Sequence, residues 1–238
     1  KHPSIRKGNY EEAIREPGLI KVEGWYETPA VQHCHIENFI CYAEMIGERI
    51  KVVTSTQIPH IVRRVVGQAL GLPWGSIQVI KPYIGGGFGN KQDVLYEPLC
   101  AWLCMQLGGH LVKLDIPRED TFVSTRVRHA IRNHIISWVR PDGTFVARKL
   151  EAFSDQGAYA SHGHSIVAKG MGAFPQLYPC DNVECDAYTV FTNKSVAGAM
   201  RGYGIPQAMW AVECHTEEVA ARLGMDPIEF RRKNLMPV

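Results

Sequence analysis

The segment KPYIGGGFGNKQD, residues 81 to 93, places three consecutive glycines, a phenylalanine and a fourth glycine directly after the β-like run at residues 77–80. An amphipathic helix pattern precedes this strand, and a second helix pattern follows the loop. A strand, a glycine-rich loop and a helix in this order suggest anion binding, because bare backbone amides and a helix N-terminus attract negative charge. The segment also predicts an α+β, or mixed α/β, fold in which sheets pack with helices.

Two familiar phosphate-binding patterns do not fit this loop. The P-loop requires Gly-Lys-Ser/Thr, whereas Asn90 precedes Lys91 and Gln92 follows it. The dinucleotide fingerprint, counted from Gly85, requires a glycine where Asn90 stands. A tight turn that packs strand against helix remains an alternative for the glycines alone. Phe88 argues against that alternative, because loops of this kind are otherwise expected to be polar.

Local patterns predict the elements on both sides of the loop. The helix patterns cover residues 55–73, 94–109, 206–224 and a last helix opened by Asp226-Pro227, and the strand patterns cover 77–80, a hairpin at 134–153 and 184–193. The hairpin turns at Pro141-Asp142-Gly143. No repeat, linker or low-complexity tract appears, so a single compact unit is the simplest division.

The composition favours small-molecule chemistry. The chain has 238 residues, 45% of them hydrophobic, and its 26 Lys and Arg nearly balance 24 Asp and Glu, so no nucleic-acid partner is expected. No apolar run reaches the roughly 18 residues of a membrane helix, and Lys1-His2-Pro3 does not resemble a signal peptide, which predicts a cytoplasmic protein without a membrane partner. Because the chain begins on Lys1 with a polar stretch, we expect a fragment of a longer polypeptide.

Cysteine and histidine patterns give no metal site. Seven cysteines occur without a C-x-x-C pair, which argues against a disulfide scaffold, a zinc ribbon and iron-sulfur ligation. Cys100 and Cys104 are predicted to be buried thiols. His33 and His35 alternate, as residues on one side of a strand do, but no third ligand accompanies them, so this pair and His162-Gly163-His164 are interpreted as structural.

Two segments carry a resemblance to a known family. GGGFGNK, residues 85–91, resembles the GGGFGGK signature of the xanthine dehydrogenase and aldehyde oxidase family, the molybdenum hydroxylases. AMRGYGIPQ, residues 199–207, is similar to that family's A-F-R-G-F-G-x-P-Q, and RRKNLMP, residues 231–237, is a weaker match. The resemblance runs from about residue 17 onward and is strongest to bacterial purine or xanthine dehydrogenases with separate subunits. It implies that residues 1–238 form the first half of the molybdenum cofactor-binding region of the large subunit, with the fold of that molybdopterin-binding domain.

The resemblance implies a cofactor site. The residues it assigns to the molybdopterin are Gly86, Gly87, Phe88, Gly89, Arg201 and Gly202. Phe88 would face the metal's oxygen ligand with its main chain, and Arg201 would lie beside the metal. The segment AVQHCHIEN, residues 30–38, is similar to the family's Q-E-H-F-Y-L-E, whose glutamine donates to the metal's oxo group. Gln32 is the predicted counterpart, although alignment on Glu37 places Val31 there.

The predicted substrate residues depart from the family pattern. Tyr203 replaces a phenylalanine that stacks on a purine, and it keeps the aromatic face. Gln92 stands where purine-oxidising members carry glutamate, and it can hydrogen-bond a purine edge but cannot take up a charge or proton in the same way. Lys169 aligns with an arginine that stabilises charge on the purine, and it keeps the cation without the forked geometry. Xanthine and hypoxanthine are therefore expected substrates, with other azaheterocycles and aldehydes open.

The resemblance also implies what lies outside this chain. The expected cofactor is molybdenum-molybdopterin, in the cytosine dinucleotide form of bacteria, with 2Fe-2S and FAD on other domains or subunits. The family's general base is a glutamate downstream of Val238, so no catalytic residue is assigned here and the fragment is not expected to turn over alone. The alternatives are a non-catalytic module that binds a cofactor or a neighbouring subunit, and a divergent pseudoenzyme.

Overall fold

The computed structural model describes residues 2–236, so Pro237, the last residue of the RRKNLMP segment, lies outside the described residues together with Lys1 and Val238. The chain forms two compact units, which we call the five-stranded unit (residues up to 31, 129–197 and 202 onward) and the four-stranded unit (residues 32–128 and 198–201). The prediction of a single compact unit was wrong. It rested on the absence of a linker, and the chain passes between the two units without a segment rich in glycine, proline or serine. The predicted mixture of helices and strands is confirmed.

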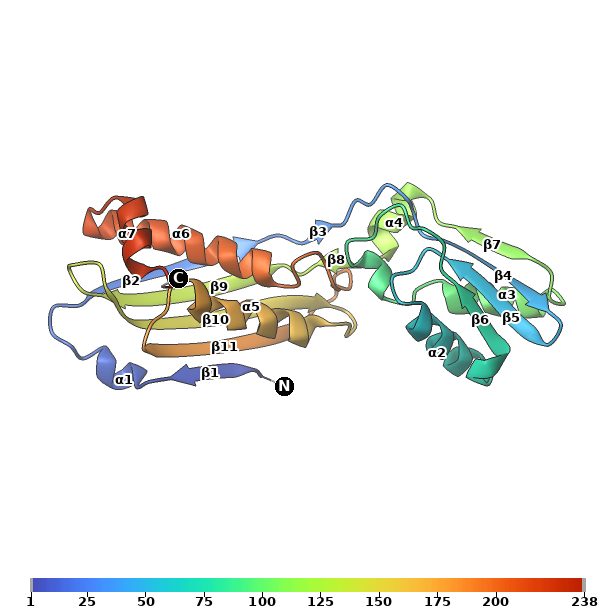
Figure 1. The fold of residues 1–238 in the computed structure, drawn as a ribbon, viewed down its shortest axis with the longest axis horizontal. Helices are drawn as coiled ribbons and strands as arrows, with labels where there is room; N and C mark the ends of the chain where they lie inside the picture. Colours follow the sequence, from blue (N-terminus) through green and yellow to red (C-terminus); the bar gives the residue numbers. More distant parts are fainter. Residues whose placement is uncertain (1, 237–238) are drawn as a thin grey trace. The chain divides into compact units, whose positions relative to one another are not determined.

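The five-stranded unit is an antiparallel sheet with one parallel pair (Figure 1). Its elements are β1 (Ser4–Lys7), α1 (Tyr10–Ala13), β2 (Ile20–Thr28), β9 (Ile131–Val139), β10 (Phe145–Gly157), α5 (Gly163–Leu177), β11 (Asn182–Phe191), α6 (Ile205–Leu223) and α7 (Pro227–Asn234). The strand order is β1-β11-β10-β9-β2. Strands β10 and β11 are parallel and α5 connects them, whereas the β9–β10 hairpin predicted around Asp142 is antiparallel.

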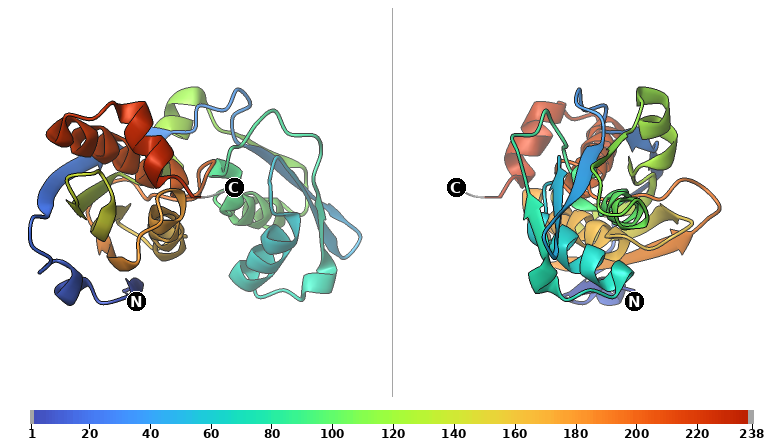
Figure 2. Two further views of the ribbon diagram at one scale, coloured as in Figure 1. Left: turned by 60° about the vertical axis from the view of Figure 1, so that its left-hand side comes forward. Right: turned by 90° about the vertical axis from the view of Figure 1, so that its right-hand side faces the viewer.

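Helices α5 and α6 pack against this sheet and against each other (Figures 1 and 2). The core is formed by alternate residues of the strands, such as Ile135 and Val139 of β9, and by one side of α6, including Val212 and Val219. Helix α7 begins as predicted, because the Asp226 carboxylate accepts hydrogen bonds from two amides of its first turn.

Helix α5 is the longest element that the local patterns missed, and several strands, such as β2, were missed as well. It contains Gly163, Gly170 and Gly172 and even Pro175, all of which lower helix propensity. Close packing of α5 against the beginning of α6 compensates for this low propensity. This packing requires a glycine, because a Cβ at Gly170 would lie 2.8 Å from the Gly204 carbonyl oxygen. Gly170 therefore lets α5 approach the beginning of α6.

The four-stranded unit has a smaller sheet in the order β6-β5-β4-β7 (Figure 1). Its elements are β4 (Ile40–Ile46), β5 (Arg49–Thr54), α2 (Pro59–Leu70), η1 (Trp74–Ser76), β6 (Ile77–Ile80), η2 (Asn90–Gln92), α3 (Glu97–Gln106), β7 (Val112–Asp115) and α4 (Arg118–Ser124), and the short strands β3 (Val31–Gln32) and β8 (Val127–Arg128) lie where the chain passes between the units. Strands β5 and β6 are parallel, and α2 connects them. The predictions of α2, β6 and α3 are confirmed.

Helices α2 and α3 enclose the core of this unit. Cys100 and Cys104 are fully buried among aliphatic residues such as Val52 and Val62, which confirms that both are buried thiols. The glycine-rich loop leaves the end of β6 and returns through η2 to α3. Within residues 2–236, every helix is too short or too polar to span a bilayer.

Candidate functional site

The glycine-rich loop after β6 bends at Phe88. Phe88 has a φ of 53°, and Gly86 and Gly89 near it have φ values of 102° and 109°. This left-handed conformation suits glycine but costs a bulky residue about 1–3 kcal/mol, so the surrounding structure must hold Phe88 in place. The residue remains 46% exposed. A strained, exposed aromatic residue is typical of ligand sites rather than of ordinary turns.

The glycines of the loop are required by neighbours in the same unit. A Cβ at Gly85 would lie 2.7 Å from the Glu37 Cβ, and one at Gly87 would lie 2.5 Å from Gln57 Oε1. A Cβ at Gly89 would overlap the Ala199 carbonyl oxygen. The bare backbone therefore serves close packing within the protein, in addition to any approach of a ligand.

The second family segment lies directly against this loop. The Arg201 amide donates to the Phe88 carbonyl oxygen at 2.8 Å, and the Arg201 carbonyl accepts from Arg128 Nη2 at 2.7 Å. His33 Nε2 lies 2.7 Å from the Ala199 carbonyl oxygen and is therefore the donor. The resemblance places both Phe88 and Arg201 at the metal, and the hydrogen bond between them shows that the two residues adjoin within the four-stranded unit.

Asn90 organises the loop, and the sequence analysis missed this role. The side chain is buried, and its Nδ2 lies 3.0 Å from Thr125 Oγ1 and 3.1 Å from His35 Nε2. Its Oδ1 accepts from the Arg126 amide at 3.1 Å. Asn90 stands where the family signature has glycine, so this chain has a hydrogen-bonding side chain at a position that otherwise has none. The only available signal was that departure from the signature.

Gln32 is tied into the same network. Its Nε2 lies 3.3 Å from the Thr121 and Phe122 carbonyl oxygens and from Thr125 Oγ1. Its Oε1 accepts from the His33 amide at 2.7 Å. The amide of Gln32 is thus bonded to its own unit, and its assignment to the metal's oxo group stays a prediction.

A buried ion pair fixes the two ends of the loop. Lys91 Nζ lies 2.6 Å from Glu37 Oε2, and this oxygen also accepts from the Gly85 amide at 2.9 Å. Burial lowers the pKa of Lys91. Burial alone would raise the pKa of Glu37, but the hydrogen bonds from Lys91 and Gly85 outweigh it and lower this pKa. The short distance and the second donor favour the ionised pair.

The H-x-H pair does not lie on a strand, because β3 ends at Gln32. His35 Nδ1 lies 2.5 Å from the Glu37 carbonyl oxygen, so Nδ1 is the donor and Nε2 accepts from Asn90. Burial lowers the pKa of both His33 and His35, which favours their neutral forms. Both imidazoles therefore take part in the hydrogen bonding of the four-stranded unit.

Two of the predicted substrate residues meet in the five-stranded unit. Tyr203 has a φ of 51° and stands between Gly202 and Gly204, both also left-handed. Lys169 Nζ lies 5.8 Å from the centroid of the Tyr203 ring. The His162 ring packs edge-on against Tyr203, at a centroid distance of 6.0 Å and an angle of 69°. His162 was not among the predicted site residues, although the sequence analysis noted it in the H-G-H pattern.

Gln92, the third predicted substrate residue, belongs to the four-stranded unit. It ends η2, and its amide donates to the Gly89 carbonyl at 3.0 Å. Its side chain is partly buried and forms no hydrogen bond with another residue of the described chain. The side-chain amide is thus not needed to hold the fold.

The residues around Phe88 suit an anionic, oxygen-rich group such as a pterin with its phosphate. Arg201 is exposed, and its guanidinium forms no ion pair or hydrogen bond within residues 2–236. Its backbone is nevertheless fixed at both the amide and the carbonyl. A positioned backbone with an available cation is the donor set that recognises phosphate and oxo groups.

Comparison with known proteins gives a consistent family. The family model described as the molybdopterin cofactor-binding domain matches residues 1–235. The chain is 47% identical over 235 residues to the xanthine dehydrogenase molybdenum-binding subunit of Escherichia coli O157:H7, covering 98% of this chain and 31% of that subunit. It is 34% identical over 232 residues to the nicotinate dehydrogenase large molybdopterin subunit of Eubacterium barkeri, covering 97% of this chain and 54% of that subunit.

A solved structure has the same fold. The aldehyde oxidoreductase from Desulfovibrio gigas superimposes with a TM-score of 0.93 and 27% identity, covering 100% of this chain and 26% of that one. The chain therefore spans only about a third of the length of the Escherichia coli subunit and about a quarter of the aldehyde oxidoreductase.

Proposed function

The chain belongs to the molybdopterin cofactor-binding domain family, and we propose that it is the first half of the cofactor-binding region of a molybdenum hydroxylase. The proposed enzyme oxidises a purine such as xanthine or hypoxanthine, or a similar heterocycle, with water as the oxygen source. The observation that supports this function best is the 2.8 Å hydrogen bond from the Arg201 amide to the Phe88 carbonyl, which joins the two family segments.

The cofactor would be held by Gly86, Gly87, Phe88, Gly89, Arg201 and Gly202, with Gln32 as a donor beside the metal. When bound, the molybdenum group supplies the two-electron oxidation of the substrate carbon. The Arg201 guanidinium offsets the negative charge of the group, and the Phe88 main chain is held in one orientation by its hydrogen bond. Because hydrogen bonds of the protein already position the loop, little ordering is required when the cofactor binds.

The substrate would be recognised by Gln92, Lys169 and Tyr203. The Tyr203 ring offers a flat face to a planar heterocycle, and His162 restrains that ring by edge-on packing. The Lys169 ammonium stabilises negative charge that develops on the heterocycle. Gln92 offers both a donor and an acceptor to the edge of the ring, and its side chain is not engaged by the fold.

The rest of the proposed enzyme lies outside this chain. The general base is a glutamate of the second half of the region, so this chain alone does not turn over. Electrons leave through 2Fe-2S and FAD groups on other domains or subunits, and the assembled enzyme is cytoplasmic. The cofactor carries the cytosine dinucleotide form of the pterin.

The test uses the full-length protein purified with its partner subunits. We expect one molybdenum per copy and reduction of a dye that depends on hypoxanthine, xanthine, nicotinate or an aromatic aldehyde. A folded complex without molybdenum and without dye reduction would contradict the enzyme and support a non-catalytic binding module. Molybdenum without dye reduction, together with a missing downstream glutamate, would identify a pseudoenzyme.

A further inference from the structure

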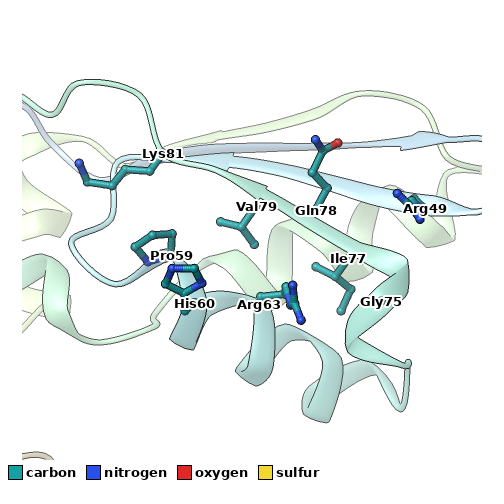
Figure 3. A pocket seen from close by; sticks show the side chains of 9 residues that line it. All are labelled: Arg49, Pro59, His60, Arg63, Gly75, Ile77, Gln78, Val79 and Lys81. Atoms are coloured by element: carbon teal, nitrogen blue, oxygen red, sulfur yellow. The ribbon is translucent and has the colours of Figure 1, made fainter.

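The four-stranded unit carries a concave site built from basic residues, apart from the Phe88 loop (Figure 3). The cavity has a volume of about 420 Å³. Its basic side chains are Arg49, His60, Arg63 and Lys81, and no Asp or Glu lines it. We call this site the basic pocket. Its volume falls in the range of small-molecule sites, about 300–1,000 Å³.

The β5–α2–β6 crossover brings these side chains together. Arg49 begins β5, His60 and Arg63 lie on the first turns of α2, and Lys81 follows the last residue of β6. Since Ile50 pairs with Ile77, Arg49 lies at the start of β6 and Lys81 at its end. At about 3.3 Å per residue, the pocket therefore extends roughly 10 Å along this strand. Figure 3 shows Arg49 and Lys81 at opposite ends, with His60 and Arg63 between them.

The floor of the basic pocket is apolar. Ile77 is buried and Val79 is partly buried, and both line the cavity between β6 and α2. An apolar floor lowers the local dielectric and strengthens the interaction of the cations with a bound anion. The pocket is therefore better suited to charge recognition than a flat surface would be.

These cations differ from several other basic residues of the same unit. Lys51, Lys91, Lys113 and Arg126 each form an ion pair with an acidic side chain. By contrast, the side chains of Arg49, Arg63 and Lys81 form no ion pair or hydrogen bond across the described range 2–236. Like charges that gather around one hollow repel each other unless an anion lies between them.

We propose that the basic pocket binds a small molecule that carries two or more phosphate groups. Arg49, Arg63 and Lys81 bring three positive charges, and each phosphoryl group carries about −1.5 to −2, so two groups balance the charge whereas one carboxylate does not. The forked donors of the two arginines match phosphate oxygens, and Lys81 adds a point charge at the far end. The pocket shares no residue with the proposed cofactor and substrate sites, so this proposal does not depend on them.

The test is calorimetric titration of the full-length protein with inorganic phosphate, pyrophosphate and tripolyphosphate at fixed ionic strength. Affinity is expected to rise along this series, at least tenfold from phosphate to tripolyphosphate, because a longer chain reaches more of the three cations. Arg63→Glu and Lys81→Glu are each expected to weaken tripolyphosphate binding at least tenfold. Arg64→Glu is the matched control, since Arg64 is exposed on the same helix but does not line the pocket, and it should bind as the unmodified protein does.

Thermal unfolding of each variant verifies that the reversed charge leaves the fold intact, and the two lining variants test the pocket independently. The proposal is overturned if tripolyphosphate shows no saturable binding at millimolar concentration, or if Arg64→Glu weakens it as much as Arg63→Glu does. Tighter binding of hexaglutamate than of tripolyphosphate would also overturn it, because that result identifies an acidic partner chain as the ligand.

Discussion

The two glycine–aromatic–glycine turns have nearly the same backbone conformation but are held by different means. Phe88 and Gly89 have φ values of 53° and 109°, and Tyr203 and Gly204 have 51° and 95°. Both turns lead into a helix, η2 or α6, and their cap glycines have ψ values of −22° and −24°. These two aromatics and Cys34 are the non-glycine residues with positive φ in the part of the chain that the structure describes.

The turn at Phe88 is held largely by side chains. Gln57 accepts from the Gly89 amide, Asn90 connects three segments, and Glu37 binds Gly85 and Lys91. The turn at Tyr203 also packs closely against backbone, because a Cβ at Gly204 would overlap the Ile166 carbonyl oxygen of α5. A polar network can be weakened one bond at a time, whereas a backbone contact is lost only when the helices separate. The two turns should therefore respond differently to substitution.

The largest effect is expected at the Tyr203 turn. Gly204→Ala adds a methyl group to a site without space and at a φ of 95°, so it should lower the free energy of unfolding by about 3–5 kcal/mol. Gly172→Ala in α5 is the control, because a Cβ there meets no atom within 4 Å, and it should be neutral or stabilising by up to about 1 kcal/mol. Urea unfolding measures both. Equal free energies for the two variants would refute the packing role of Gly204.

A smaller loss is expected at the side-chain-held turn. Asn90→Ala removes the partner of the Arg126 amide and of His35, so it should lower the free energy of unfolding by about 2–3 kcal/mol. Asn193→Ala, at an exposed asparagine, should change it by less than about 0.5 kcal/mol. Chemical denaturation of the two variants side by side checks this difference. An Asn90 variant as stable as its control would mean that the network does not support the turn.

His215 should make the five-stranded unit sensitive to acid. This imidazole is buried between Tyr26 and Ser137, and burial lowers its pKa to about 3. Between pH 6.5 and that value the unfolded chain binds a proton that the folded chain does not, so stability falls as the pH falls. The loss is about 2 kcal/mol from pH 6.5 to 5, and His215→Gln should remove it. Unfolding at several pH values gives the slope, and an unchanged slope in the variant would contradict this assignment.

The smallest effect on stability is expected at Gln92, next to the first turn. Because the Gln92 side chain is not engaged by the fold, Gln92→Glu should leave the free energy of unfolding within about 0.5 kcal/mol. The same change should shift the relative kcat/KM for hypoxanthine, xanthine and nicotinate by about tenfold, since it places a charge at the substrate edge. An unchanged substrate profile would mean that Gln92 does not reach the substrate.

Local chemistry was enough to predict several elements, such as α2 and the β9–β10 hairpin, but not the arrangement around Phe88. Helix α2 has its stop at Gly71, and the β9–β10 turn has Asp142-Gly143, so nearby residues specify both. The division into two units and the Asn90 network depend on residues far apart in sequence, such as Asn90 and Thr125. Helix α5 depends on the packing of Gly170 against Gly204, which the residues of α5 alone do not predict. The pairing of Phe88 with Arg201 was accessible only because family resemblance joined two distant segments.

The central claim is that the Phe88 loop and residues 199–201 together hold the molybdenum cofactor, and the molybdenum content of an Arg201→Ala variant of the full-length protein tests it most directly. Because the Arg201 guanidinium has no bonded partner in residues 2–236, the variant should unfold at the same denaturant midpoint as the unmodified protein. Molybdenum per copy should nevertheless fall at least tenfold, while Arg64→Ala keeps full content. Full molybdenum in the Arg201 variant would contradict the account.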